Sequence, residues 1–329
     1  MNTADPVAFA AISTLLERGD AQAALGQARS AVAFYTEALK QASQREQWPA
    51  GFAERLAHAR GVCAHYASAY ASHLQRHLAQ AGFDPQRSSP RFAESLDIVL
   101  GRKQPYVQQP RFYLFPGLPQ IQFYKRVTFP WLDQVERATD VIRDELTGLL
   151  EDPSLFAPYV QGEVGRPVTR KSNLFNNPAW TACYLWKNGQ PVLPLAVRCP
   201  QTLRALVGAP LAYMPDRSPS ILFSVLQPGA RIPPHNGLIN TRLICHLPLI
   251  VPEGCGLRVG NDVRALEVGK AWVFDDTIEH EAWNSSDRTR AILLFDIWRP
   301  ELSAEERQLV SNLFKSIDAF EGEKPVWEI

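Results

Sequence analysis

The chain has 329 residues, of which 46% are apolar and 21% are charged, and these proportions are typical of a globular protein in water. Lys plus Arg and Asp plus Glu each number 34, so the net charge is zero, and the absence of a basic run excludes nucleic acid as the main partner. No apolar run is long enough for a membrane span, and no secretion segment opens the chain. The five cysteines lack a disulfide-type spacing, so we expect a cytoplasmic protein with no membrane part.

The first part of the chain is rich in Ala, Leu, Glu and Gln, which indicates helices. Gly19-Asp20 has the form of a helix stop followed by an N-cap, and residues 21–42 then carry apolar residues at helical spacing. Residues 50–80 show a third helical pattern. The first two helices are similar to one tetratricopeptide-type hairpin, although no second copy follows. We therefore expect an α-helical region over residues 1–104, a hairpin plus a long helix, with a protein as its potential partner.

The middle of the chain is expected to connect this region to a helix. Residues 83–127 are richer in Pro, Gln and aromatic residues, which predicts an irregular connector. Thr128 is then expected to cap a helix that has Pro130 in its first turn. The buried stripe of this helix is predicted to consist of Trp131, Val135, Ala138, Ile142, Leu146 and Leu149. A final helix is expected to begin at Ser303, where Glu306 completes a capping box.

From Trp180 onward the pattern changes to short runs of strand-forming residues separated by Gly and Pro. The predicted strands are residues 182–186, 220–226, 240–251, 255–260, 270–275 and 290–298. Strands of this number and spacing favour a double-sheet jelly roll. We therefore predict an α+β protein whose second domain, residues 105–329, is a cupin-like double-stranded β-helix.

Two histidines at the edges of predicted strands are the strongest candidates for metal ligands. His235 lies in a turn that enters a strand, and His280 follows an Asp-Asp loop after another strand. Two imidazoles brought together by a small barrel can hold one Fe(II) and leave its other positions open. The carboxylate that usually completes such a site is missing, because Gly237 stands there. Water, Asp275 or Asp276 is a candidate for that space, and an ordinary turn is the alternative role for the two acids.

Three cationic residues are predicted to point into the barrel. Arg242 and His246 lie on one face of an otherwise apolar strand, and Arg290 begins another strand. Turning them inward costs several kcal/mol unless an anion meets them. We interpret them as a dicarboxylate site, in which Arg290 binds one end and Arg242 with His246 binds the other. In the alternative interpretation, Arg242 pairs with an acidic core residue, which could be Asp275, Asp276 or Asp296.

Residues 224–302 resemble the aspartyl/asparaginyl β-hydroxylase family of Fe(II)- and 2-oxoglutarate-dependent dioxygenases. The matching stretches are PPHNGLINTRLICHLPLIVPEGC, GKAWVFDDTIEHEAWN and ILLFDIWRPELS. With two upstream clusters, FPGLPQIQFYKRVTFPWL and RCPQT, the resemblance covers roughly residues 105–315. This family has a two-histidine iron site without the carboxylate, which accounts for Gly237.

The resemblance implies roles for particular residues. His235 and His280 match the iron ligands, Ser224 and Arg290 match positions that bind the distal carboxylate of 2-oxoglutarate, and His246 matches one that binds the carboxylate next to the keto group.

One position departs from the family pattern. Ile244 stands where a family member carries an arginine, whereas Arg242 is present in both sequences. Because Arg242 shares the strand face of Ile244, we expect it to take over the anion contact.

The activity implied by the resemblance is hydroxylation of an unactivated carbon, with Fe(II), 2-oxoglutarate and O2. The expected target is the β-carbon of an Asp or Asn residue, or a related small amino-acid or peptide substrate. Three alternatives stay open. These are a hydroxylase of a lipid acyl chain or natural product, a halogenase with chloride in the gap at Gly237, and a non-catalytic binding module recruited by the N-terminal helices.

Overall fold

The computed structural model describes residues 6–43, 48–49, 51–161 and 175–321. Contacts divide the chain into two units, Met1–Lys103 and Gln104–Ile329, and each is described by itself. None of the helices in the described part of the chain combines the length and apolar character that a membrane crossing needs.

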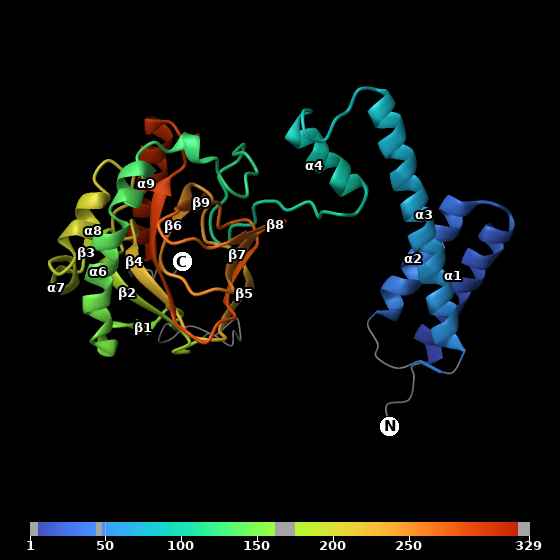
Figure 1. The fold of residues 1–329 in the computed structure, drawn as a ribbon, viewed down its shortest axis with the longest axis horizontal. Coiled ribbons are helices and arrows are strands. Elements are labelled where there is room, and N and C mark those ends of the chain that lie inside the picture. The colour runs from blue at the N-terminus through green and yellow to red at the C-terminus, as the bar shows by residue number, and fades with distance from the viewer. Residues whose placement is uncertain (1–5, 44–47, 50, 162–174, 322–329) are drawn as a thin grey trace. The chain divides into compact units, whose positions relative to one another are not determined.

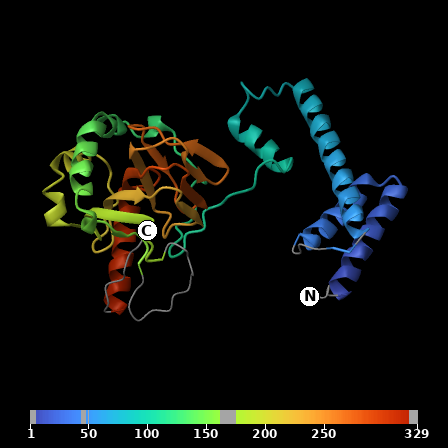
Figure 2. The ribbon, with the colours of Figure 1, turned by 60° about the horizontal axis from the view of Figure 1, so that its bottom comes forward.

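The first unit is helical, as its composition predicts (Figures 1 and 2). Its helices are α1 Pro6–Ala24, α2 Ala28–Ala42, α3 Phe52–Gln80 and α4 Pro90–Val99. The first three share one apolar core, which includes Ile12, Leu16, Tyr35 and Leu56. Burial of these side chains stabilises the three helices against one another.

The predicted helix stop at Gly19-Asp20 is wrong, because α1 continues through both residues. A Cβ at Gly19 would overlap the ring of Tyr35, so glycine here permits close packing of α1 on α2. The Tyr35 hydroxyl donates a hydrogen bond to Oδ1 of Asp20 at 2.7 Å. Past the last residue of α1 the chain reaches Gly26, whose φ of 71° lies in the left-handed region that favours glycine.

The second unit contains two antiparallel sheets (Figure 1). The larger sheet has the order β1-β2-β4-β11-β6-β9, with β3 paired to β2, and the smaller has the order β5-β10-β7-β8. The strands are β1 Ala157–Pro158, β2 Trp180–Lys187, β3 Gln190–Pro191, β4 Ile221–Leu226, β5 Arg231–His235, β6 Arg242–Ile250, β7 Cys255–Val259, β8 Asp262–Ala265, β9 Trp272–Phe274, β10 His280–Asn284 and β11 Arg290–Trp298. The predicted α+β class with a double-stranded β-helix core is therefore confirmed.

The larger sheet is buried on both faces. One face packs against the smaller sheet through residues such as Leu222, Ile292 and Leu257. The other packs against helices through residues such as Phe223 and Ile142. Because neither face of β4 and β11 meets water, their sequences are mostly apolar rather than alternating, and the polar exceptions are Ser224, Arg290 and Asp296.

Helices cover the larger sheet and flank it. They are α5 Leu132–Arg137, α6 Thr139–Leu150, α7 Leu193–Ala196, α8 Pro200–Ala205 and α9 Ala304–Glu321, with short 3-10 helices η1 Arg126–Thr128 and η2 Pro153–Leu155. The capping box of α9 is confirmed: the Ser303 N–H donates to the Glu306 carboxylate at 2.7 Å, and the Glu306 N–H donates to the Ser303 hydroxyl at 3.2 Å.

The predicted cap at Thr128 is wrong. Thr128 ends η1, and the α-helix begins only at Leu132. Between them Phe129 is buried and packs against the rings of Tyr124 and Trp131, so aromatic packing sets the backbone path there.

Two glycine-to-alanine substitutions in the first unit should have opposite effects on the free energy of unfolding. Gly19→Ala should destabilise the chain by about 1–3 kcal/mol, because the new methyl group overlaps the buried Tyr35 ring. Gly61→Ala is the matched control within α3, where a Cβ meets nothing, and it should stabilise by about 0.5–1 kcal/mol. Urea unfolding of the full chain, followed by circular dichroism, measures both. A gain in stability for Gly19→Ala would contradict the packing argument.

Candidate functional site

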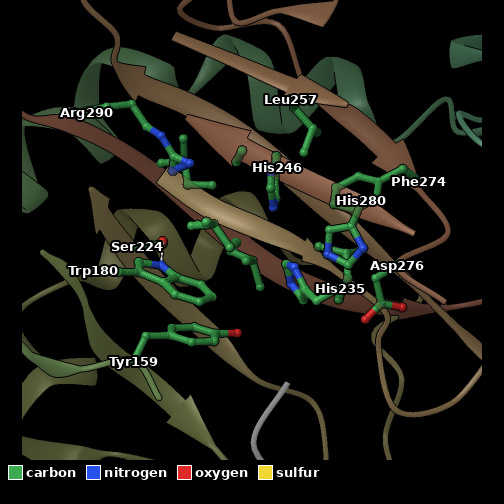
Figure 3. Close-up of a pocket in the computed structure, with 15 residues that line it drawn as sticks. Tyr159, Trp180, Ser224, His235, His246, Leu257, Phe274, Asp276, His280 and Arg290 are labelled. Carbon is green, nitrogen blue, oxygen red and sulfur yellow. Dashed lines mark hydrogen bonds between the residues drawn. The ribbon is translucent and has the colours of Figure 1, made fainter. Parts of the chain in front are cut away.

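Strand pairing in the smaller sheet places the two predicted metal ligands opposite each other. His235 is the last residue of β5, His280 is the first of β10, and the two are register partners. Their ring centroids are 4.1 Å apart, with an angle of 48° between the ring planes. Both line the same pocket (Figure 3).

Hydrogen bonds define which nitrogen of each imidazole is available. Nδ1 of His235 lies 2.8 Å from the carbonyl oxygen of Pro233, and Nδ1 of His280 lies 3.2 Å from that of Ile278. A carbonyl oxygen only accepts, so each Nδ1 must carry the hydrogen, which leaves the Nε2 lone pair for a metal. Burial lowers the pKa of His235 to about 3 and that of His280 to about 4, so both imidazoles are neutral near pH 7.

The carboxylate of Asp276 fills the space beside Gly237. A Cβ at Gly237 would overlap this carboxylate, and the Gly237 N–H donates to the Asp276 carbonyl at 2.7 Å. Burial raises the pKa of Asp276, and Arg242 opposes that rise. Within the described ranges, no three His, Cys, Asp or Glu side chains form a metal-binding group. The site is therefore a histidine pair with one carboxylate nearby.

The neighbouring acid, Asp275, has a structural role. Its carboxylate accepts hydrogen bonds from Arg299 Nη1 at 2.8 Å and from Gln108 Nε2 at 2.7 Å. It also accepts from the hydroxyl of Thr277 at 2.5 Å. Asp275 is fully buried, and these contacts tie the loop before His280 to the core.

Arg242 contacts acids and is not among the residues that line the cavity. Its Nη2 donates to Oδ2 of Asp276 at 3.2 Å, and its Nε lies 3.9 Å from Oδ2 of Asp296. This is the buried ion pair that the sequence left open as the alternative. Ile244, two residues later on β6, does line the cavity, so the wall at this position is apolar.

A buried cation lies at the other end of the cavity. Arg290 is 1% exposed, and within the described part of the chain its Nε and Nη1 have no hydrogen-bond partner. Burial lowers the pKa of Arg290 to about 10, so the guanidinium stays charged at neutral pH. Ser224 and His246 line the same cavity, and Nδ1 of His246 also lacks a partner among these residues. Unpaired buried donors are costly, which indicates an anion site.

Two aromatic residues of the cavity wall were missed by the sequence analysis. Tyr159 and Trp180 stack with ring centroids 4.0 Å apart and an interplanar angle of 12°. Nε1 of Trp180 donates to Oγ of Ser224 at 3.0 Å. The sequence signal at Trp180, an aromatic residue just before a predicted strand, is common to many buried strands and does not single out a site.

The Gly237–Asp276 contact predicts coupling between these two positions. Gly237→Ala should cost about 1–3 kcal/mol in the natural chain, because its methyl group meets the Asp276 carboxylate. In an Asp276→Ala background this cost should largely disappear. Thermal unfolding of the four proteins measures the coupling. Gly148→Ala is the control at an exposed position of α6, where a Cβ meets nothing, and it should have the same effect in both backgrounds. Equal costs for Gly237→Ala in both would contradict the contact.

Comparison with known proteins identifies relatives of this chain. The chain is 32% identical to human aspartyl/asparaginyl beta-hydroxylase over 176 residues, which are 53% of this chain and 22% of the human protein. It is 29% identical to human aspartate beta-hydroxylase domain-containing protein 2 over 215 residues, 64% of this chain and 56% of that protein.

A bacterial relative and a family model complete the comparison. The chain is 33% identical to the ornithine lipid ester-linked acyl 2-hydroxylase of Rhizobium tropici over 180 residues, 54% of this chain and 60% of that protein. Each of these matches therefore spans less than two thirds of the relative. The model of the family described as aspartyl/asparaginyl beta-hydroxylase matches residues 136–300, which include both histidines and Arg290. The chain belongs to the aspartyl/asparaginyl beta-hydroxylase family.

Proposed function

We propose that this protein is an Fe(II)- and 2-oxoglutarate-dependent hydroxylase. The observation that carries the proposal is that the two ends of one cavity present different chemical groups. Two neutral imidazoles, His235 and His280, lie at one end. Arg290, whose Nε and Nη1 have no hydrogen-bond partner among the described residues, lies at the other (Figure 3). A metal ion and a dicarboxylate bound to it would satisfy both ends.

The histidine pair fits Fe(II). Nε2 of His235 and Nε2 of His280 are the two ligands that this chain would supply, because each Nδ1 is held by a backbone carbonyl. Asp276 would add a negative charge close to the cation without being a required ligand. Imidazole nitrogen suits iron, and two protein ligands leave positions for a cosubstrate and O2.

The opposite end fits a carboxylate. Nε and Nη1 of Arg290 lack hydrogen-bond partners in the part of the chain that the structure describes, and Ser224 supplies a hydroxyl group. His246 lines the same cavity and would donate to the carboxylate next to the keto group. Arg242 would not take this role, because its guanidinium already contacts two aspartates. With Fe(II) bound, 2-oxoglutarate and O2 would give succinate and CO2 while one oxygen atom enters a C–H bond of the substrate. The apolar walls would exclude water from this reaction.

For the substrate, we propose the β-carbon of an Asp or Asn residue, or a related small amino-acid or peptide substrate. The family and the named activity of its human relative support this choice. The Rhizobium tropici relative, named an acyl 2-hydroxylase, favours a lipid acyl chain as the second candidate. A chloride-binding halogenase is disfavoured, since the Asp276 carboxylate would repel an anion beside Gly237.

The cofactor part of the proposal can be tested without a substrate. Under anaerobic conditions, Fe(II) and 2-oxoglutarate together should produce a weak visible charge-transfer band. His235→Ala should abolish it by removing a metal ligand, and Arg290→Ala should weaken it at a fixed 2-oxoglutarate concentration by removing the anion contact. The matched controls, His73→Ala on α3 and Arg288→Ala before β11, change exposed residues and should leave the band intact. Absence of the band in the folded natural chain would reject the hydroxylase and favour a non-catalytic binding module.

The substrate class is tested by oxygen incorporation. We expect that Asp- or Asn-containing peptides and small amino acids, incubated with ¹⁸O2, Fe(II) and 2-oxoglutarate, include a product heavier by one labelled oxygen atom at the β-carbon. His280→Ala should lose that product because it removes a proposed iron ligand. Mass spectrometry with fragmentation locates the label. Labelling of acyl lipids alone would instead support the lipid hydroxylase.

A further inference from the structure

Another pair of histidines lies on α3, in the first unit. His73 and His77 are four residues apart, so they share one face of the helix and are separated by one turn. Their ring centroids are 4.2 Å apart, with an angle of 40° between the ring planes. Both side chains are exposed, so the two rings meet at the surface of the helix. Two imidazoles at this spacing on one helix face can bind the same zinc ion.

Packing does not account for this pair. The buried residues of α3, Phe52, Leu56 and Ala59, all lie in its first three turns, and no residue of the helix after Cys63 is buried. Within the described residues, neither imidazole takes part in a hydrogen bond or an ion pair. A metal ion would therefore meet no competing partner for the ring nitrogens in this part of the chain.

The position of the pair along the helix favours a cation. Because α3 ends at Gln80, His77 lies in its last turn and His73 in the turn before. The last carbonyl groups of a helix have no partner within it, so this end carries a partial negative charge that attracts cations. An ion held by both rings would also tie these two turns together. Helical segments without tertiary packing are only marginally stable, so such a link would stabilise the end of α3.

We propose that His73 and His77 form a binding site for one divalent transition-metal ion that prefers nitrogen ligands, namely Cu(II), Ni(II) or Zn(II). Imidazole suits these ions, whereas Mg(II) and Ca(II) require oxygen ligands and are not expected to bind. The proposal does not rest on the proposed function, because the pair belongs to the first unit and uses no residue of the cavity.

The test counts and measures bound metal. Isothermal titration calorimetry of the full chain with Ni(II) alone is carried out on the His235→Ala protein, which lacks a proposed iron ligand. We expect this protein to bind one Ni(II). Adding His73→Ala or His77→Ala should raise the Kd at least about tenfold, since loss of even an outer partner of a metal ligand costs that much. Alanine favours helix, so both variants should fold.

Two control proteins separate the pair from histidine content. His65→Ala removes an exposed histidine of α3 that has no other histidine three or four residues away, and it should leave the Kd unchanged. Combining Gln75→His with His77→Gln keeps the number of histidines but moves one ring to another side of the helix. This combination should weaken Ni(II) binding as much as His77→Ala does. Mg(II) in place of Ni(II) should give no binding.

A stability measurement gives a second readout. Ni(II) that binds only the folded helix should raise the midpoint of urea unfolding, followed by circular dichroism, in the His235→Ala protein. The same addition should have no effect once His73→Ala is also present.

The outcomes are distinct. No Ni(II) binding to the His235→Ala protein, or a Kd that His73→Ala and His77→Ala leave unchanged, would overturn the proposal. Full binding after Gln75→His with His77→Gln would also overturn it. The natural chain should bind two Ni(II) ions. If it binds only one, and His73→Ala alone abolishes that binding, the site on α3 stands and the metal centre of the proposed function fails.

Discussion

The antiparallel pairing of β5 with β10 is the constraint on which the site depends. It makes His235 and His280 register partners, although 45 positions in the sequence separate them. A shift of one residue would turn one imidazole to the opposite face of the sheet. The hydrogen bonds from each Nδ1 to a carbonyl two residues earlier then leave both Nε2 lone pairs available. The proposed metal site therefore depends on the ends of two strands.

The two buried arginines near the cavity differ in whether an acid in the protein balances their charge. Near the histidines, the Arg242 guanidinium contacts Asp276 and Asp296, so that charge is compensated within the protein. Both arginines have buried nitrogens without a hydrogen-bond partner among the described residues, but Arg290, unlike Arg242, has no acid beside it there. An uncompensated buried cation is costly for the protein alone, and its cost falls when a ligand brings a negative charge. The protein thus pairs one buried cation with acids and leaves the other able to meet a bound anion.

The contacts of Asp276 explain why residue 237 is a glycine and carries no carboxylate. Asp276, from the loop after β9, occupies the volume that a side chain at residue 237 would need. Its backbone carbonyl also accepts from the Gly237 N–H, which ties the two loops together. Glycine is therefore required here by close approach of another chain segment. The loss of one ligand and the placement of a nearby acid are two consequences of a single packing arrangement.

Local sequence patterns were sufficient for the helical character of the first unit, for the six apolar strands and for the capping box at Ser303, because these depend on spacing between neighbours in the chain. The helix stop predicted at Gly19 and the cap predicted at Thr128 were wrong. The contact of Gly19 with Tyr35 and the burial of Phe129 determine the backbone path at these positions. The strands β5, β8 and β10 escaped detection because they are short and partly exposed.

The sequence by itself determined the fold class and, through its family resemblance, the residues proposed for the site. Only the tertiary structure decided that Arg242 contacts aspartates, that Asp276 fills the gap at Gly237, and that Trp180 holds Ser224. The physical reason is distance along the chain. A strand pattern shows which residues point inward, but it does not show which inward-pointing groups meet, since that depends on register between strands far apart in sequence.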